Sequence, residues 1–517
     1  MRTFLTLLGL GIAFLGLTSS AARGQMAGDP FQGYAQGGQP QAMSAFQTRL
    51  PSIWPGNLWF ETNLADNGLG YSGSYATLGS KARLFEDFLD GRWMLETQGH
   101  VSLERGKFFS NIGLERAFTL DAAGSDLYFS AWYDYDDDQV GPFGHTFHQL
   151  GLSGGVRSRK YDLYGNAYLP SGTTEYTQGD PTGQTVFFNR NIVTQAGIDA
   201  ALQGFDAHIV ARPEALGFVN GYVDIGTYAY QSDLIDTFAG ISAKFGMQTL
   251  GGLVTSIQLN HDERFQTTGV LQVGWMFGAR GSRTESSAVG RDLDPTPRND
   301  HIVRYQQDLR LAIDPDTNNP YVVLHVDNTA AAGGDGTFQR PFRTLAEAQA
   351  ASGTDAIIYV HRGDGTTTGM ANGIVLKDNQ FLLGDGLVHT IPIVGGNFDI
   401  FNRRDGLRPT ITNTAGNAVT LANNNTVRGV IIDGTAGGLA NGISGDGGLG
   451  SLSNGIIEDV TILGNPILNG INLVAIDGNW SFARNNITTA GQDGIHIDNL
   501  TGSTSRLTFT NNVVSNN

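Results

Sequence analysis

The feature that most constrains this chain is a two-residue alternation of apolar and polar side chains from Asn57 to about Gly278. In residues 127–135 the apolar face carries Leu127, Phe129, Ala131, Tyr133 and Tyr135, and the other face carries Ser130, Trp132 and Asp134. Successive side chains of a strand point to opposite faces, so these segments are predicted strands with one apolar face. Residues 160–169, 219–229 and 270–277 repeat the pattern.

The length of these segments favours a transmembrane barrel over a soluble β-sandwich, which is the alternative. They run about ten residues, whereas soluble strands average about five or six, and their aromatic residues gather near the ends, as in a membrane-interface girdle. Glycine inside strands suits a sharply curved, closed sheet; the glycines concerned are Gly113, Gly151, Gly154, Gly155, Gly197 and Gly274. Roughly twelve such segments predict an antiparallel outer-membrane β-barrel over residues 57–279.

The N-terminus predicts export. Arg2 precedes an apolar run over residues 4–17 and small residues at 18–22, which is the pattern of a signal peptide, assigned here to residues 1–25. Residues 26–56 are rich in Gly and Gln and are expected to form a flexible leader. No later segment approaches the ~18 apolar residues that a membrane-spanning helix needs.

Composition excludes several classes of function. The net charge of −17 argues against nucleic acid as a partner, because phosphate binding requires a basic surface. The chain has no cysteine, which excludes a disulfide scaffold and a thiolate metal site.

The alternation of apolar and polar residues ends after Gly278. Residues 280–320 are polar, contain four prolines and are assigned as a linker. A strand is expected at 321–326 and another at 356–360. Between them a helix is expected over about 344–351, with Thr344 and Glu347 forming a capping box.

Residues 321–517 contain an internal repeat of about 26 residues, which predicts a parallel β-helix. One track recurs at Asn417, Asn441, Asn469 and Asp493, and a second recurs at Val427, Ile457, Ala483 and Phe509. Ile and Val are expected to form ladders inside, while Asn and Gly take the left-handed corners, where stacked Asn amides bond one another. The helix at 344–351 is expected to cover the first coil, and the β-helix is expected to continue beyond Asn517.

Several motifs in the predicted barrel, and one just past it, resemble those of inverse autotransporters of the intimin and invasin type. They are residues 129–136 (FSAWYDYD), 148–152 (HQLGL), 161–170 (YDLYGNAYLP), 204–208 (GFDAH), 260–262 (NHD), 274–278 (GWMFG) and 298–303 (RNDHIV). The resemblance implies a twelve-stranded barrel in the outer membrane, a linker within its pore and an extracellular passenger. It also implies insertion by the barrel assembly machinery, with Phe277 as part of the signal.

The passenger departs from the best-known members of that family, because it has neither tandem immunoglobulin-like domains nor a lectin-like tip. Residues 326–328 (VDN), 334–337 (GDGT) and 341–345 (PFRTL) resemble instead the opening of right-handed parallel β-helices of the pectin-lyase type. That fold occurs in polysaccharide lyases and hydrolases and also in non-catalytic adhesins.

A search for chemistry in the β-helix yields weak candidates only. A glycoside hydrolase needs two carboxylates about 5–10 Å apart, and Asp433, Asp459 and Asp493 are candidates, with His496 near the last. Asp459 is better explained as a corner residue that becomes Asn485 and Asn511 in later coils, and His496 as an outward-facing strand residue. Arg428 and Arg484, expected at one track position, could bind an acidic sugar, but an exposed face would also place arginine there.

Other acidic residues are explained by local structure. Asp335 and Asp364 lie beside glycine in turns, and nothing near them assembles the six to eight oxygens of a Ca²⁺ site. Asp134, Asp136, Asp137 and Asp138 form an acidic run at a strand end, interpreted as a solvated loop at the barrel rim, with a cation-attracting mouth as the alternative.

The sequence therefore predicts an all-β outer-membrane protein that displays a β-helix at the cell surface for adhesion or surface binding. We assign no catalytic, cofactor-binding or metal-binding residue. The expected partners are outer-membrane lipid, the barrel assembly machinery and an extracellular ligand such as a glycan or another cell surface. A surface-tethered polysaccharide lyase or hydrolase is the alternative, and a plain porin with a C-terminal tail is a third reading.

Overall fold

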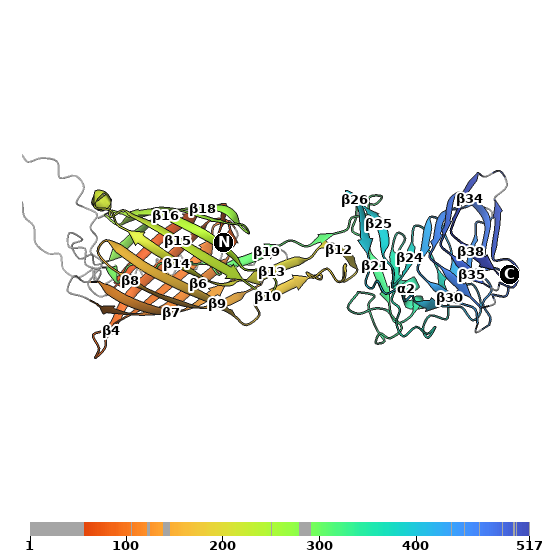
Figure 1. The fold of residues 1–517 in the computed structure, drawn as a ribbon, viewed down its shortest axis with the longest axis horizontal. Helices are drawn as coiled ribbons and strands as arrows, with labels where there is room; N and C mark the ends of the chain where they lie inside the picture. Colours follow the sequence, from red (N-terminus) through yellow and green to blue (C-terminus); the bar gives the residue numbers. More distant parts are fainter. Residues whose placement is uncertain are drawn as a thin grey trace, which may run out of the picture. The chain divides into compact units, whose positions relative to one another are not determined.

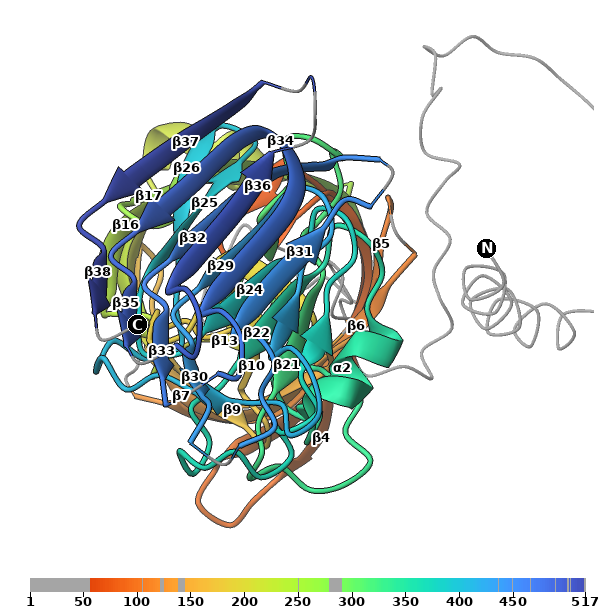
Figure 2. The same ribbon diagram turned by 90° about the vertical axis from the view of Figure 1, so that its right-hand side faces the viewer.

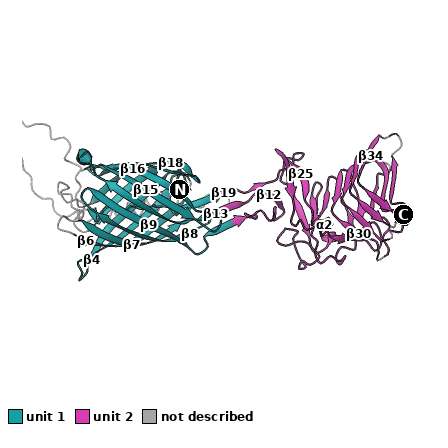
Figure 3. Cartoon of the chain, viewed as in Figure 1, with its two compact units in different colours: residues 1–176, 199–306 teal, residues 177–198, 307–517 magenta. Residues whose placement is uncertain are grey.

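The computed structural model describes residues 56–515, except 105, 121–124, 138–144, 250, 279–290, 436, 449, 465, 489, 500–501 and 503. The expected signal peptide, and the leader up to residue 55, lie outside the described residues. The chain divides into two compact units (Figure 3). Unit 1 comprises Met1–Tyr176 and Asp199–Gln306, and unit 2 comprises Thr177–Ile198 and Gln307–Asn517. Residues 177–198, which interrupt the barrel sequence, thus belong with the C-terminal part.

Unit 1 contains a closed barrel of twelve antiparallel strands, which confirms the predicted fold (Figure 1). Asn57 on the first strand lies opposite Gly278 on the last, and this pairing closes the cylinder. The strands are β1 (Gly56–Leu64), β4 (Tyr75–Glu86), β5 (Arg92–Ser102), β6 (Phe108–Thr119), β7 (Asp126–Asp136), β8 (Phe147–Arg157), β9 (Tyr161–Ser171), β14 (Gln203–Ala211), β15 (Tyr222–Gln231), β16 (Phe238–Gln248), β17 (Leu253–Asp262) and β18 (Gln266–Gly278).

The two faces of the barrel strands divide as the alternation predicts. On β7 the side chain of Phe129 is 57% exposed on the outside, whereas Ser130 and Asp134 are buried inside. Large apolar side chains such as Leu163, Ile225 and Ile241 repeat this exposure around the cylinder. An apolar exterior over a polar interior is the arrangement of a barrel that faces lipid. One boundary differs, because Val219 ends a 3₁₀ helix (Glu214–Val219) and β15 begins only at Tyr222.

Glycine inside the barrel strands makes room for aromatic side chains of the neighbouring strand. Gly113 on β6 lies opposite Trp132 on β7. A Cβ atom placed on Gly113 would lie 2.5 Å from the Trp132 ring. The absence of a side chain therefore lets the buried indole lie flat against the wall.

Unit 2 is built around a parallel β-helix of about six turns, as expected (Figure 2). Its larger sheet contains β21 (Val323–Val326), β22 (Ile357–Val360), β24 (Phe381–Gly384), β29 (Asn425–Arg428), β32 (Leu452–Glu458), β34 (Ile471–Ala483), β31 (Ile443–Asp446), β28 (Val419–Thr420) and β23 (Ile374–Val375), with β36 (Ile495–Asn499) and β37 (Ser505–Thr510) paired to β34. A second sheet contains β27 (Thr410–Ile411), β30 (Ile431–Asp433), β33 (Thr461–Leu463), β35 (Asn486–Thr488) and β38 (Val513–Ser515).

Shorter elements complete the fold. They are β2 (Asn67–Gly68), β3 (Tyr71–Ser72), β10 (Glu175–Gln178), β11 (Phe187–Phe188), β12 (Asn191–Gln195), β13 (Gly197–Ala201), β19 (Arg304–Gln307), β20 (Arg310–Leu311), β25 (His389–Ile393) and β26 (Gly396–Ile400). The helix α2 (Leu345–Ala351) starts at Thr344, where both hydrogen bonds of the predicted capping box with Glu347 are present. Within the described residues, no helix has the length and hydropathy needed to cross a membrane.

Apolar ladders and asparagine corners hold the coils in register, as predicted. Ile432, Ile462 and Ile487 are aligned on successive coils of the second sheet, and all three are buried. At one corner Asn424 has a left-handed backbone with φ 57°, and its amide donates to Asn379 at 2.8 Å. Asn454 repeats the conformation one coil later and donates to Asn424 at 2.9 Å.

Candidate functional site: the barrel lumen

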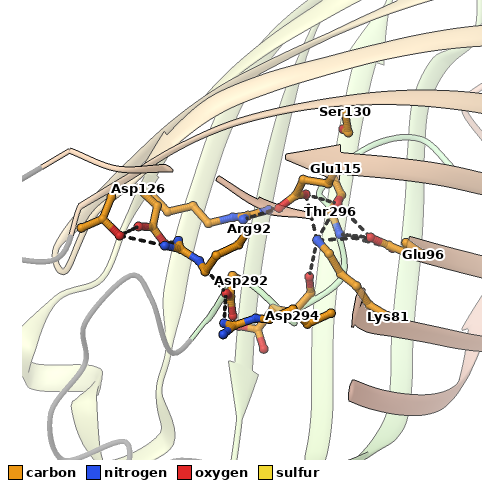
Figure 4. A network of polar contacts seen from close by, with 12 residues as sticks. Lys81, Arg92, Glu96, Glu115, Asp126, Ser130, Asp292, Asp294 and Thr296 are labelled. Carbon is orange, nitrogen blue, oxygen red and sulfur yellow. Dashed lines mark hydrogen bonds and ion pairs between the residues drawn. The ribbon is translucent and has the colours of Figure 1, made fainter. Parts of the chain in front are cut away.

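The inner face of strands β4, β5 and β6 carries a cluster of buried charges (Figure 4). Lys81 on β4 contacts Glu115 on β6 at 2.8 Å and Glu96 on β5 at 3.4 Å. Arg157 on β8 also reaches Glu115, with two hydrogen bonds of 2.7 and 3.0 Å. Buried charges are stable only when they are paired, and each of these groups has an opposite charge within reach.

A segment that follows the last barrel strand, residues 291–306, supplies further groups to this cluster. The Thr296 hydroxyl lies 2.8 Å from a Glu96 oxygen and 2.9 Å from a Glu115 oxygen. Lys81 donates to that same hydroxyl at 3.0 Å and to the carbonyl of Asp294 at 3.2 Å (Figure 4). The side chains of the barrel wall and the polar groups of the segment thus form one network.

A second network joins the same segment to the wall at a different height. Asp292 accepts from Arg83 at 2.6 Å and from Arg92 at 3.1 Å. Arg92 is shared with Asp126 on β7, at 2.7 Å. Arg291 reaches Asp162, at the start of β9, at 2.8 Å.

The acidic run of β7 is the main correction to the sequence interpretation. Asp134 and Asp136 face the lumen and are about 1% exposed, so they do not form a solvated loop at the rim. Arg298 binds Asp134 with two hydrogen bonds of 2.6 Å, and His301 lies 3.6 Å from Asp136. The strand continues through these residues, and its alternation turns both carboxylates inward, where Arg298 pairs with Asp134 and Arg304 lies 3.8 Å from Asp136. Asp137 lies beyond the strand and accepts from Thr146, and Asp138 is outside the described residues.

The contacts of the segment progress along the barrel strands. Leu293 accepts a hydrogen bond from the Asn57 side chain, at the rim where β1 begins and β18 ends. Asn299 donates to the Tyr230 hydroxyl at 2.7 Å. Arg304 donates its backbone N–H to Gly70, in the connection after β1, and pairs with Asp199 at 2.7 Å.

A cavity of about 260 Å³ remains beside the segment. Besides residues of the segment, it is lined by Glu61 from β1, Ser242 and Lys244 from β16, Asn260 from β17 and Gln272 from β18. The ion pairs of the segment lie mainly with β4 to β9.

The residues considered as catalytic candidates in the β-helix have separate partners. Asp433 accepts from the Thr435 N–H at 2.8 Å, and exposed Asp493 lies 3.4 Å from exposed His496. His496 faces outward, as expected. Asp335 and Asp364 accept from the backbone and hydroxyl groups of Thr337 and Thr366, which is turn chemistry.

The alignment of the arginines differs by one residue from the prediction. Arg428 aligns with Glu458 and Ala483, so Arg484 corresponds to Asp459 and not to Arg428. Asp459 has φ 54°, as a left-handed corner requires, and pairs with Arg484 at 2.7 Å. The later corner residues are Arg484 and Asn511, both with positive φ, whereas Asn485 lies one position further on. The second track therefore runs through Val427, Ile457, Phe482 and Phe509, with Phe482 in place of the expected Ala483.

A buried polar cluster on the first coils was missed by the sequence analysis. Tyr359 donates to Asp385 at 3.1 Å, and His325 lies 3.1 Å from His361. Burial opposes ionisation of Asp385, but hydrogen bonds from His361, the Gly386 N–H and Asn402 outweigh it and lower its pKa to about 2. The sequence feature that could have revealed this cluster is a polar residue within an otherwise apolar strand, such as His325 in β21.

No protein-family model matches this chain, and no curated protein matches its sequence. Among solved structures, a protein from a study of the in-meso crystallization of membrane proteins matches 48% of this chain and 100% of its own, with 13% identity and a TM-score of 0.37. The KdgM porin in complex with oligogalacturonate matches 43% and 99%, with 6% identity and a TM-score of 0.28. Outer membrane phospholipase A from Escherichia coli matches 44% and 98%, with 9% identity and a TM-score of 0.28. These matches cover less than half of the chain.

Proposed function

We propose that this chain anchors itself in the outer membrane through its barrel, passes residues 291–306 through the lumen and displays its β-helix at the cell surface. The observation that carries the proposal is the progression of contacts along the segment, from Asn57 at one rim to Gly70 and Asp199 at the other. A plug without a transport role could occupy the lumen in any direction. A chain in transit must enter at one rim and leave at the other.

The lengths of the strand connections support the orientation. The rim that contains Asn57 and Gly278 has short connections, such as residues 158–160, whereas the opposite rim has the long connection at 172–202. Bacterial outer-membrane barrels have short periplasmic turns and longer extracellular loops. The segment therefore leaves the barrel on the extracellular side, which is the topology of inverse autotransporters. Phe277, exposed on the last strand, is available to the barrel assembly machinery.

Whole-cell proteolysis with epitope tags tests this orientation. One tag is placed in the turn at residues 232–237 and a second in the turn at 87–91, at opposite rims. We expect external protease to cleave the first tag and a site engineered in the β-helix on intact cells, and to reach the second tag only after the outer membrane is permeabilised. Protection of the β-helix on intact cells would overturn display, and recovery of the protein in detergent-free buffer as a dissolved monomer would overturn anchoring.

For the displayed β-helix we propose adhesion or surface binding. Partly exposed charges lie together on this unit, where Arg428 lies 3.1 Å from Glu458 and Arg484 pairs with Asp459. Binding of whole cells to immobilised glycans and to other cells tests this role, with the Arg428→Ala and Arg484→Ala double variant as comparison. Equal binding by cells that express only the barrel would count against it.

A further inference from the structure

A hairpin in the barrel sequence packs on the β-helix. Residues 186–193 contain β11 and the first part of β12, which are antiparallel partners, with Phe187 opposite Ile192. The hairpin lies in the connection between barrel strands β9 and β14, yet it belongs to the same compact unit as the β-helix. We call residues 186–193 the β11–β12 hairpin.

The hairpin buries the outer face of the first coils. Phe187 and Ile192 are almost fully buried, in one cluster with Val323, Ile357 and Tyr359. The Phe187 ring centroid lies 4.7 Å from that of Tyr359 on the second coil and 4.7 Å from that of His325 on the first. These β-helix residues point away from the inner ladder, which contains Leu324, Ile358 and Leu382. The first coils therefore have an apolar surface on both sides of the sheet, and the hairpin covers the outer one.

The hairpin also satisfies backbone groups at the start of the β-helix. Val323, on the edge strand β21, donates its N–H to the carbonyl of Arg190 at 2.8 Å. Phe338 donates to Asn189 at 2.7 Å, and Ala312 donates to Ile192 at 2.9 Å. An edge strand of a repeat protein leaves such groups open unless another element covers them.

From these contacts we infer that the β11–β12 hairpin is a built-in template on which the β-helix begins to fold. Each coil of a solenoid is stabilised by its neighbours, and the first coil has no preceding coil to pack on. The hairpin precedes the β-helix in the chain, within the connection between barrel strands β9 and β14, so closure of the barrel restricts it before the first coil forms. It then supplies an apolar cover for the outer face of the first coils and a carbonyl acceptor for the edge strand β21.

Kinetics separate a template from a cap that docks late. Weakening a contact that is already formed in the folding transition state slows folding. Weakening a contact that forms later mainly accelerates unfolding. The test uses the full chain in detergent, in urea that unfolds the β-helix and leaves the barrel folded. Protease resistance of the β-helix is sampled over time in both directions.

Three variants make the test specific. For Phe187→Ala we expect refolding to slow by at least about tenfold with little change in the unfolding rate. Phe188→Ala, the same change one residue along on the half-buried side of β11, should refold at the native rate. Ile487→Ala, a buried truncation in a late coil, should accelerate unfolding and leave refolding unchanged.

Two outcomes would overturn the inference. In the first, Phe187→Ala refolds at the native rate but unfolds faster, which would make the hairpin a cap that docks late. In the second, Phe188→Ala slows refolding as much as Phe187→Ala does. If Phe187→Ala does not refold at all, the smaller truncation Phe187→Leu supplies the two rates. The inference does not depend on surface display, because the refolding is measured in detergent and the orientation is measured on cells.

Discussion

Glu115 shows how one residue organises the lumen. Its carboxylate is shared by Lys81, Arg157 and the Thr296 hydroxyl, all buried. Removing one partner of a buried charge network leaves the others without a counter-charge. For Glu115→Gln we expect the barrel to lose about 3 kcal/mol of stability, measured as a lower unfolding temperature in detergent.

A matched pair on the surface provides the control for that prediction. Lys160 and Glu214 are also 2.8 Å apart, but both are largely exposed. Solvent screens such a pair, so Glu214→Gln should change the unfolding temperature far less. Equal losses in the two variants would show that the lumen screens charges as bulk water does.

His325 makes the β-helix sensitive to acid. Burial, aided by the neighbouring His361, lowers the pKa of His325 well below 6.5 although Asp385 opposes the shift. At a pH between the pKa of His325 in the folded protein and 6.5, the unfolded chain binds a proton that the folded chain does not bind. The stability that is present above pH 6.5 is therefore lost as the pH falls below 6.5.

We expect the urea midpoint of the β-helix in the full chain to fall between pH 7.5 and pH 5.5. His325→Gln, which cannot titrate, should reduce this fall. An unchanged pH dependence in the variant would assign the effect to other groups, such as His389, whose pKa burial also lowers.

At the scale of the element, the left-handed corners set the stacking of the coils. Asn424 combines φ 57° with a hydrogen bond to Asn379 on the preceding coil. Gly removes the amide but accepts this backbone, whereas Ala removes the amide and is strained there by about 1 kcal/mol.

We therefore expect Asn424→Ala to lower the urea midpoint more than Asn424→Gly does. Asn423, next to it but with an ordinary backbone, should show the opposite order. A larger loss for Asn424→Gly would show that the corner geometry contributes little.

At the scale of the whole molecule, the segment at 291–306 occupies part of the barrel lumen. It lies inside the lumen, and a cavity of about 260 Å³ remains beside it. We expect small currents from the full chain in a planar bilayer and distinctly larger ones from a chain that ends at residue 290. Equal conductance would mean that the segment does not obstruct the pore.

Much of the fold could be predicted from the sequence because its two periods are local. An alternation such as that of residues 127–135 specifies a strand and its two faces, and the recurrence at Asn417, Asn441 and Asn469 specifies stacked coils. The capping box at Thr344 was predictable for the same reason, since its partners lie three residues apart.

The lumen network and the hairpin depended on the tertiary structure, since their partners are far apart in the chain. Alternation placed Asp134 on the polar face, but only closure of the barrel around residues 291–306 brought Arg298 to it. The strands at Val323 and Ile357 carry apolar residues on both faces, a sign of burial on both sides, yet the sequence did not identify the covering element. Local patterns determined the strands and coils, whereas the pairing of distant charges and the covering of the first coils were decided only when the chain closed on itself.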